Sequence, residues 1–202
     1  MVELETNLRD IARANRLFGG IAPIARVLAE TRASEVLDVG CGAAEIPREL
    51  LRRGLSLRIT CLDPSEQMLS IARRCNNGEF TYVQGDGTAL PFATGAFDVA
   101  MCSLTLHHIE PTGAVRFLRE LRRVSRLTPL VCDLRRSRLA YVAARLFAQL
   151  FTRNRLTRHD GPVSVLRAYT PNEALALARE AGWRAPSVRT EPWFRMTLTD
   201  RG

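Results

Sequence analysis

Two glycines separated by a single residue, Gly40 and Gly42, follow an apolar run at residues 36–39, and a helical pattern starts at Pro47. A turn without Cβ atoms lets the backbone approach a ligand closely, and the free N–H groups and the dipole of the following helix face that ligand. The pattern therefore predicts a strand, a tight turn and a helix N-terminus that bind a ligand through backbone groups.

A carboxylate ends the next apolar run, because residues 57–62 are followed directly by Asp63. In nucleotide-binding α/β sheets a carboxylate at the tip of the second strand holds ribose hydroxyls. Glu45 stands where a dinucleotide-binding turn has its last glycine, and the chain has no lysine for a phosphate-binding Gly-Lys-Ser/Thr loop. The chemistry these residues predict is the binding of a nucleoside without a pyrophosphate.

Four motifs carry a family resemblance: VLDVGCG, LDPSEQML, QGDGTALPF and FDVAMCSLTLHHI. In this order and spacing the chain resembles the class I S-adenosylmethionine-dependent methyltransferases. It is most similar to their small-molecule branch, which includes the quinone-biosynthesis methyltransferases, and the resemblance covers roughly residues 33–190. The turn of that family often reads Gly-x-Gly-x-Gly, whereas the third glycine is replaced by Ala44 here. The added methyl group is small, but it can narrow the cofactor cleft.

The resemblance implies S-adenosylmethionine as the cofactor. Asp63 would hold the two ribose hydroxyls, Asp86 with the Gly87 amide would hold the adenine edge, and Asp38 would lie near the ammonium and sulfonium of the methionine end. Asp63 also fits a helix cap and Asp86 a turn former, and these alternatives stay open. The full set expected at the cofactor is Asp38, Gly40, Cys41, Gly42, Asp63, Pro64, Met68, Gly85, Asp86, Gly87, Cys102 and Ser103.

Methyl transfer is an in-line displacement at carbon, for which the protein mainly supplies alignment and desolvation. A hydroxyl or acidic carbon acceptor also needs a base, and histidine is the natural choice near neutral pH. The chain has three histidines. His107 and His108 follow the fourth predicted strand and fit either catalysis or a packing role beneath the cofactor, while His159 lies beside Asp160. Adjacent helical residues point in different directions, so we expect His107 and His108 not to act together. No acidic cluster with ligand spacing accompanies them, so no metal is expected.

The acceptor pocket has weaker candidates. Arg135 and Arg136 follow the fifth predicted strand, where either can bind an acidic or phenolate acceptor, although solvated arginines at a strand end fit equally well. Tyr141, Arg158 and Tyr169 are further candidates for lining this pocket.

The elements that must position these residues alternate along the chain. Strands are predicted at 36–40, 57–62, 80–84, 97–103 and 129–133, with helices at 44–53, 65–75 and 112–124, and a capping box at Thr170–Glu173 starts a last helix. This alternation predicts an α/β, Rossmann-like doubly wound sheet, mostly parallel, with ligands at the carboxyl ends of the strands and an antiparallel hairpin between residues 183 and 200. We expect a single domain over 1–202, with an N-terminal helical lid at 1–32 and a cap insertion at 137–168.

Composition sets limits on the class of protein. The chain has 202 residues, 46% of them apolar and 25% charged, which suits one soluble domain. No apolar run is long enough for a membrane span and the N-terminus is unlike a secretory signal, so a cytoplasmic protein is expected. The net charge is +8, and arginine supplies all of the positive side-chain charge. Because the arginines are spread over predicted helix faces, often near glutamates, they fit solvated surfaces better than a nucleic-acid site. The five cysteines have no C-x-x-C pair and are expected to be reduced and mostly buried.

The function that follows is methyl transfer to a small phenolic or polyketide-like acceptor of secondary metabolism, most readily at oxygen. Carbon methylation of a quinone-like ring is the close alternative, and a protein that binds S-adenosylmethionine for another purpose is a second class. Nucleic-acid methylation is disfavoured because Cys102–Thr105 replaces the Asn/Asp-Pro-Pro-Tyr/Phe sequence that grips a flipped base. A homodimer is an open expectation.

Overall fold

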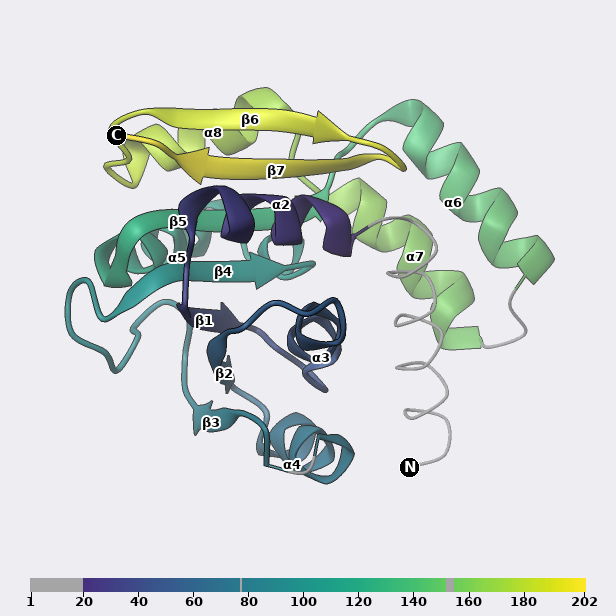
Figure 1. Cartoon of the computed structure of the whole chain (residues 1–202). Helices are drawn as coiled ribbons and strands as arrows, with labels where there is room; N and C mark the ends of the chain where they lie inside the picture. The colour runs from purple at the N-terminus through teal and green to yellow at the C-terminus, as the bar shows by residue number, and fades with distance from the viewer. Residues whose placement is uncertain (1–19, 77, 152–154) are drawn as a thin grey trace.

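The computed structural model describes residues 20–76, 78–151 and 155–202, and its centre is a seven-stranded sheet (Figure 1). The strand order is β3-β2-β1-β4-β5-β7-β6. The first five strands pair in parallel, whereas β7 runs antiparallel to both β5 and β6. The strands are β1 (Glu35–Val39), β2 (Arg58–Asp63), β3 (Thr81–Gln84), β4 (Phe97–Ser103), β5 (Ser125–Leu134), β6 (Pro186–Glu191) and β7 (Arg195–Asp200).

Both faces of the sheet are covered by helices, because successive side chains of a strand point to opposite faces. Val36 joins one apolar cluster with α2 (Ile21–Thr31), α3 (Glu45–Arg52) and α4 (Glu66–Cys75). Leu37, its neighbour, joins the other cluster with α5 (Pro111–Val124) and α8 (Pro171–Glu180). The chain order reverses between β1 and β4, which is the position where open α/β sheets bind ligands beyond the carboxyl ends of their strands.

These observations confirm the predicted doubly wound fold, including the antiparallel hairpin and the capping box of α8, in which the Thr170 and Glu173 side chains bond each other's backbone N–H groups. The largest boundary error concerns the fifth strand, for which the sequence predicts residues 129–133. It begins at Ser125, where it pairs with Phe97, and ends at Leu134.

The region predicted as a cap contains two helices, α6 (Arg138–Phe151) and α7 (Arg155–Arg167), with Pro162 inside α7. They lie beyond the carboxyl end of β4 (Figure 1), on the side where the cofactor residues are predicted. Of the predicted lid, residues 1–19 lie outside the described residues. Its described part, α2, buries Ile24, Val27 and Leu28 and belongs to the core of the sheet.

Candidate cofactor and acceptor site

The glycine turn has the conformation that its sequence predicts. Gly40 and Gly42 have φ angles of +76° and +54°, and the Gly40 amide donates to the Leu62 carbonyl at 2.7 Å. A Cβ at Gly40 would lie 2.6 Å from the Thr105 side chain, whereas one at Gly42 would meet nothing within 4 Å. Gly40 is therefore required by packing against the segment after β4, and Gly42 borders open space.

Ala44, which replaces the family's third glycine, keeps the backbone conformation of a glycine. Its φ is +57°, in the left-handed region that costs an L-residue roughly 1–2 kcal/mol. The residue is fully buried within the apolar cluster of α2 and α3. Its methyl group thus packs in the core on the helix side of the turn.

Asp63 links the turn to the next helix. One carboxylate oxygen accepts from the Gly42 amide and the other from the Ser65 amide, both at 2.9 Å. Ser65 in turn caps α4 through the Met68 amide, at 3.3 Å. A carboxylate so fixed at the tip of β2 has lone pairs left for a second acceptor role, as expected for ribose binding.

Asp38 is the most unusual charged group at this edge of the sheet. It is 2% exposed, and its Oδ1 atom has no hydrogen-bond partner among the described residues. Burial, with a smaller contribution from the Asp63 charge, raises the pKa of Asp38 to about 7. A buried carboxylate of this kind suits a positively charged ligand group, which would restore its ionised form.

The loop after β3 holds the predicted adenine residues. Gly87 lies against the core, because a Cβ there would be 2.5 Å from the Phe117 ring. Gly85 similarly faces Leu62, at 3.1 Å. Asp86 is exposed and accepts from the Thr88 amide at 2.8 Å, a turn contact that leaves its other oxygen for a ligand. Pro64 is exposed and Met68 half-buried at the start of α4.

The two cysteines predicted at the cofactor have thiols whose pKa values are raised. A hydrogen bond with the Cys61 thiol, together with burial, raises the pKa of Cys41 far above its usual range. Burial likewise raises the pKa of Cys102, whose side chain belongs to the apolar core. The next residue, Ser103, has a buried Oγ atom without a partner among the described residues. At the end of β4 the serine is therefore the side chain with free hydrogen-bonding capacity.

The two neighbouring histidine rings are in contact but differ in burial. His107 is 5% exposed, and its Nδ1 atom lies 2.7 Å from Oδ1 of Asp133. The other oxygen of Asp133 accepts the His107 amide at 3.1 Å. His108 is exposed, yet the two ring centroids are only 4.0 Å apart. The two rings are thus in contact, whereas the sequence predicts side chains that point in different directions; the segment Leu106–His108 is a short 3₁₀ turn. That the two histidines do not act together stays a prediction.

The predicted acceptor residues differ in whether their polar atoms already have partners within the protein. The guanidinium of Arg136 pairs with Glu173, and the Tyr169 hydroxyl donates to the Ile109 carbonyl at 2.6 Å. Arg135, by contrast, has a buried Nε atom with no partner among the described residues. Tyr141 is half-buried on α6. Arg158 and His159 lie in a part of α7 whose side chains are outside the described residues.

Three of the buried polar atoms without a hydrogen-bond partner share a location. Asp38, Ser103 and Arg135 stand at or just after the carboxyl ends of β1, β4 and β5, which are adjacent strands. Buried polar groups in folded proteins are nearly always paired, so three unpaired groups at one sheet edge indicate a ligand site. No group of three or more potential metal ligands occurs in the part of the chain that the structure describes.

Comparison with known proteins gives a consistent family. Residues 36–127 match the model of a methyltransferase domain. A demethylmenaquinone methyltransferase from Thermotoga maritima is 35% identical over 102 residues, which are 50% of this chain and 43% of that protein. Over residues 36–127 the chain is therefore similar to the S-adenosylmethionine-dependent methyltransferases.

Two further similarities extend this comparison. A malonyl-[acyl-carrier protein] O-methyltransferase from Enterobacter lignolyticus is 40% identical over 75 residues, 37% of this chain and 29% of that protein. A SAM-dependent methyltransferase structure from Aquifex aeolicus superposes over 96% of both chains with a TM-score of 0.69 and 18% identity. The chain thus spans less than half the length of these two relatives that it matches in sequence, while its fold matches a whole structure.

Two residues of the candidate site were missed in the sequence. Asp133 was noted only as the end of a strand, although it holds His107 through two contacts. Thr105 was noted only as part of a missing nucleic-acid motif, although its side chain packs on Gly40. The available signal for Asp133 was a buried-strand sequence ending in a carboxylate at the ligand edge.

Proposed function

We propose that this protein transfers the methyl group of S-adenosylmethionine to an acidic oxygen of a small acceptor, a phenol or a carboxylic acid. The observation that carries the proposal is the set of unpaired buried groups at one sheet edge: a carboxylate at Asp38, a hydroxyl at Ser103 and a guanidinium nitrogen at Arg135. A carboxylate suits a cation and a guanidinium suits an anion, so the set fits a cationic methyl donor beside an anionic acceptor.

S-adenosylmethionine supplies an electrophilic methyl group on a positively charged sulfur. Asp63 would bind the ribose hydroxyls, and Asp38 would lie near the positive charges. Arg135 would bind and orient the acceptor oxygen in its ionised form, so that its lone pair points at the methyl carbon. A carboxylic acid is already ionised near neutral pH, whereas a phenol must first lose its proton to a base, for which His107 and His108 are the candidates. The chain's other contribution is alignment in a site shielded from water.

Carbon methylation of a quinone-like ring is the second candidate. It is supported by the similarity to the Thermotoga demethylmenaquinone methyltransferase and by the His107–Asp133 pair. A carboxylate at Nδ1 fixes the tautomer and the orientation of an imidazole, which is a common arrangement of a general base. Product analysis by mass spectrometry and NMR distinguishes an added O-methyl from a C-methyl group.

The first test is calorimetric titration with S-adenosylmethionine and S-adenosylhomocysteine. We expect binding of both to the wild type and loss of binding in Asp63→Ala. Ser65→Ala is the matched control, because it removes the neighbouring helix cap but no predicted ribose contact. Absence of binding to a folded wild type would reduce the proposal to a statement about fold.

The second test addresses the acceptor with two adjacent arginines. Phenols and small carboxylic acids are screened with labelled methyl donor, and the best acceptor is assayed with Arg135→Gln and Arg136→Gln. Loss of a hydrogen bond to a charged group is worth about 1.5–3 kcal/mol, so Arg135→Gln should lower kcat/KM roughly 10- to 100-fold. Arg136→Gln should have little effect, because Arg136 pairs with Glu173. Equal effects of both variants would contradict the role of Arg135.

A further inference from the structure

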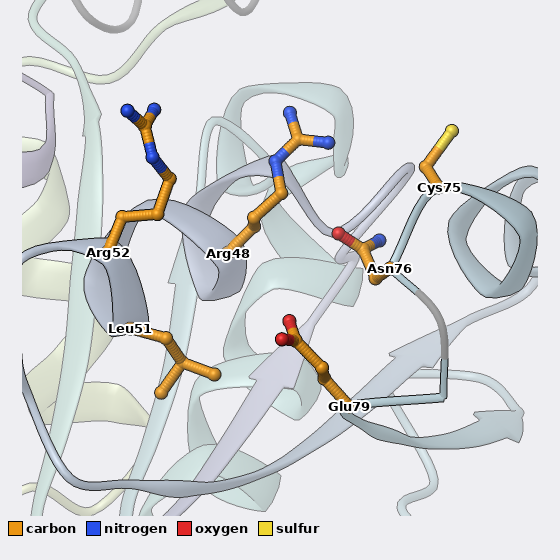
Figure 2. Close-up of a pocket in the computed structure, with 6 residues that line it drawn as sticks. All are labelled: Arg48, Leu51, Arg52, Cys75, Asn76 and Glu79. Carbon is orange, nitrogen blue, oxygen red and sulfur yellow. The ribbon is translucent and has the colours of Figure 1, made fainter.

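A cavity lies between α3 and the end of α4, apart from the residues predicted to bind the cofactor. Its volume is about 370 Å³, within the usual range of small-molecule sites. Figure 2 shows the six residues that line it: Arg48, Leu51, Arg52, Cys75, Asn76 and Glu79. None of these residues belongs to the proposed cofactor or acceptor site.

Asn76 gives this cavity a buried hydrogen-bond acceptor. The residue is 3% exposed, and its Nδ2 atom donates to the carbonyls of Ala72, at 2.7 Å, and Ala43, at 3.3 Å. Because both partners are acceptors, the orientation of the amide group is fixed. Its Oδ1 atom is left buried and has no partner among the described residues. A ligand that donates a hydrogen bond from the cavity would satisfy it.

The charges around the cavity are of both signs. Arg48 bonds Glu45 through one guanidinium nitrogen and Arg52 bonds Glu49 through one, so each keeps further N–H donors. In Figure 2 the carboxylate of Glu79 and the amide of Asn76 lie on the side of the cavity opposite α3. A simple anion would meet the Glu79 charge, and a simple cation would meet the two arginines. A molecule with both charges matches both sides.

We propose that this cavity binds a small aliphatic α-amino acid. Its ammonium group would donate to Oδ1 of Asn76 and to Glu79, and its carboxylate would accept from Arg48 and Arg52. Leu51 supplies an apolar contact for an aliphatic side chain. Because Asn76 also binds the carbonyl of Ala43, in the turn of the proposed cofactor site, the occupied cavity would border that turn.

The test is calorimetric titration of the full chain with L-leucine as the probe. Two truncated analogues serve as controls: 3-methylbutylamine lacks the carboxylate and 4-methylpentanoate lacks the ammonium. Each missing group removes charge-assisted hydrogen bonds, so both analogues should bind at least about tenfold more weakly than leucine. The titration is repeated with S-adenosylhomocysteine at saturation, because the methionine end of the cofactor site could itself take an amino acid.

Arg52→Gln and Arg53→Gln form a matched pair of variants. Both arginines are on the same end of α3 and pair with Glu49, but only Arg52 lines the cavity. We expect Arg52→Gln to weaken leucine binding about tenfold and Arg53→Gln to leave it unchanged. The proposal is overturned if leucine does not bind, if the two variants bind it equally, or if S-adenosylhomocysteine abolishes binding. None of these outcomes depends on methyl transfer.

Discussion

Replacing Asp38 by asparagine should stabilise the protein without cofactor, and more so as the pH rises. Burial raises the pKa of this carboxyl group from 3.8 to about 7 in the folded state. The folded protein therefore keeps the Asp38 proton at pH values where the unfolded chain has lost it. An asparagine side chain at this position would carry no charge in either state, so the variant avoids the cost of a buried ionised carboxylate.

The magnitude follows from the two pKa values. Below pH 3.8 the group is protonated in both states and costs nothing. Between pH 3.8 and about 7 the cost to the wild type grows by about 1.4 kcal/mol per pH unit, and above about 7 it stays near 4 kcal/mol. The stability difference between Asp38→Asn and the wild type should therefore grow by roughly 2–3 kcal/mol between about pH 5 and about pH 8.

Urea denaturation measures this difference. The fluorescence of Trp183 reports the core, because this side chain is 4% exposed and its Nε1 donates to the Leu118 carbonyl at 2.9 Å. Asparagine and aspartate also differ in hydrogen bonding, but this contributes equally to the stability difference at both pH values. It therefore does not change the increase of the stability difference with pH. A stability difference that is constant between the two pH values would refute the raised pKa of Asp38.

The same titration governs cofactor binding. If the ionised form of Asp38 attracts the positive charges of S-adenosylmethionine, affinity should increase up to about tenfold per pH unit below about pH 7 and then level off. Asp38→Asn should bind more weakly and lose this pH dependence. A pH dependence that persists in the variant would assign it to another group.

Two further predictions concern the packing of the site. Gly40→Ala should destabilise the protein by at least about 2 kcal/mol, because its Cβ would lie 2.6 Å from Thr105, whereas Gly42→Ala carries mainly the backbone strain of about 1 kcal/mol; denaturant midpoints of the pair measure the difference. Asp133→Ala should cost about 2–5 kcal/mol, because it leaves the buried His107 ring and amide without an acceptor, and Asp133→Asn should cost less. Equal losses for Asp133→Ala and Asp133→Asn would show that these hydrogen bonds do not stabilise the fold.

The order of strands and helices could be predicted because buried parallel strands form continuous apolar runs that end at turn residues. The start of β5 was missed because it does not belong to a continuous apolar run. Arg126 and Leu127 are exposed at its beginning, so the local sequence reads as a loop, although Ser125 already pairs with Phe97. Only the neighbouring strand makes this segment part of the sheet.

The backbone conformation of the candidate site was predictable where it depends on contiguous segments of the chain. The glycine turn and Asp63 depend on a strand, a turn and a helix that are contiguous in sequence. The His107–Asp133 contact joins residues 26 positions apart, and the strand register brings them together. The contact between the two histidine rings depends on their side-chain rotamers, which the sequence pattern does not give.

Arg135 and Arg136 are adjacent and of the same type, so the sequence cannot tell which of them has a partner within the protein. Arg136 pairs with Glu173 at the surface, while the Nε atom of its neighbour Arg135 is buried without a partner among the described residues. An unpaired buried group lowers the stability of the protein that carries it. Asp38 and Arg135 both impose such a cost, with opposite charges and at the same edge of the sheet. A ligand pair of complementary charges would remove both costs on binding, so the energy that weakens the empty protein would favour the joint binding of a cationic donor and an anionic acceptor.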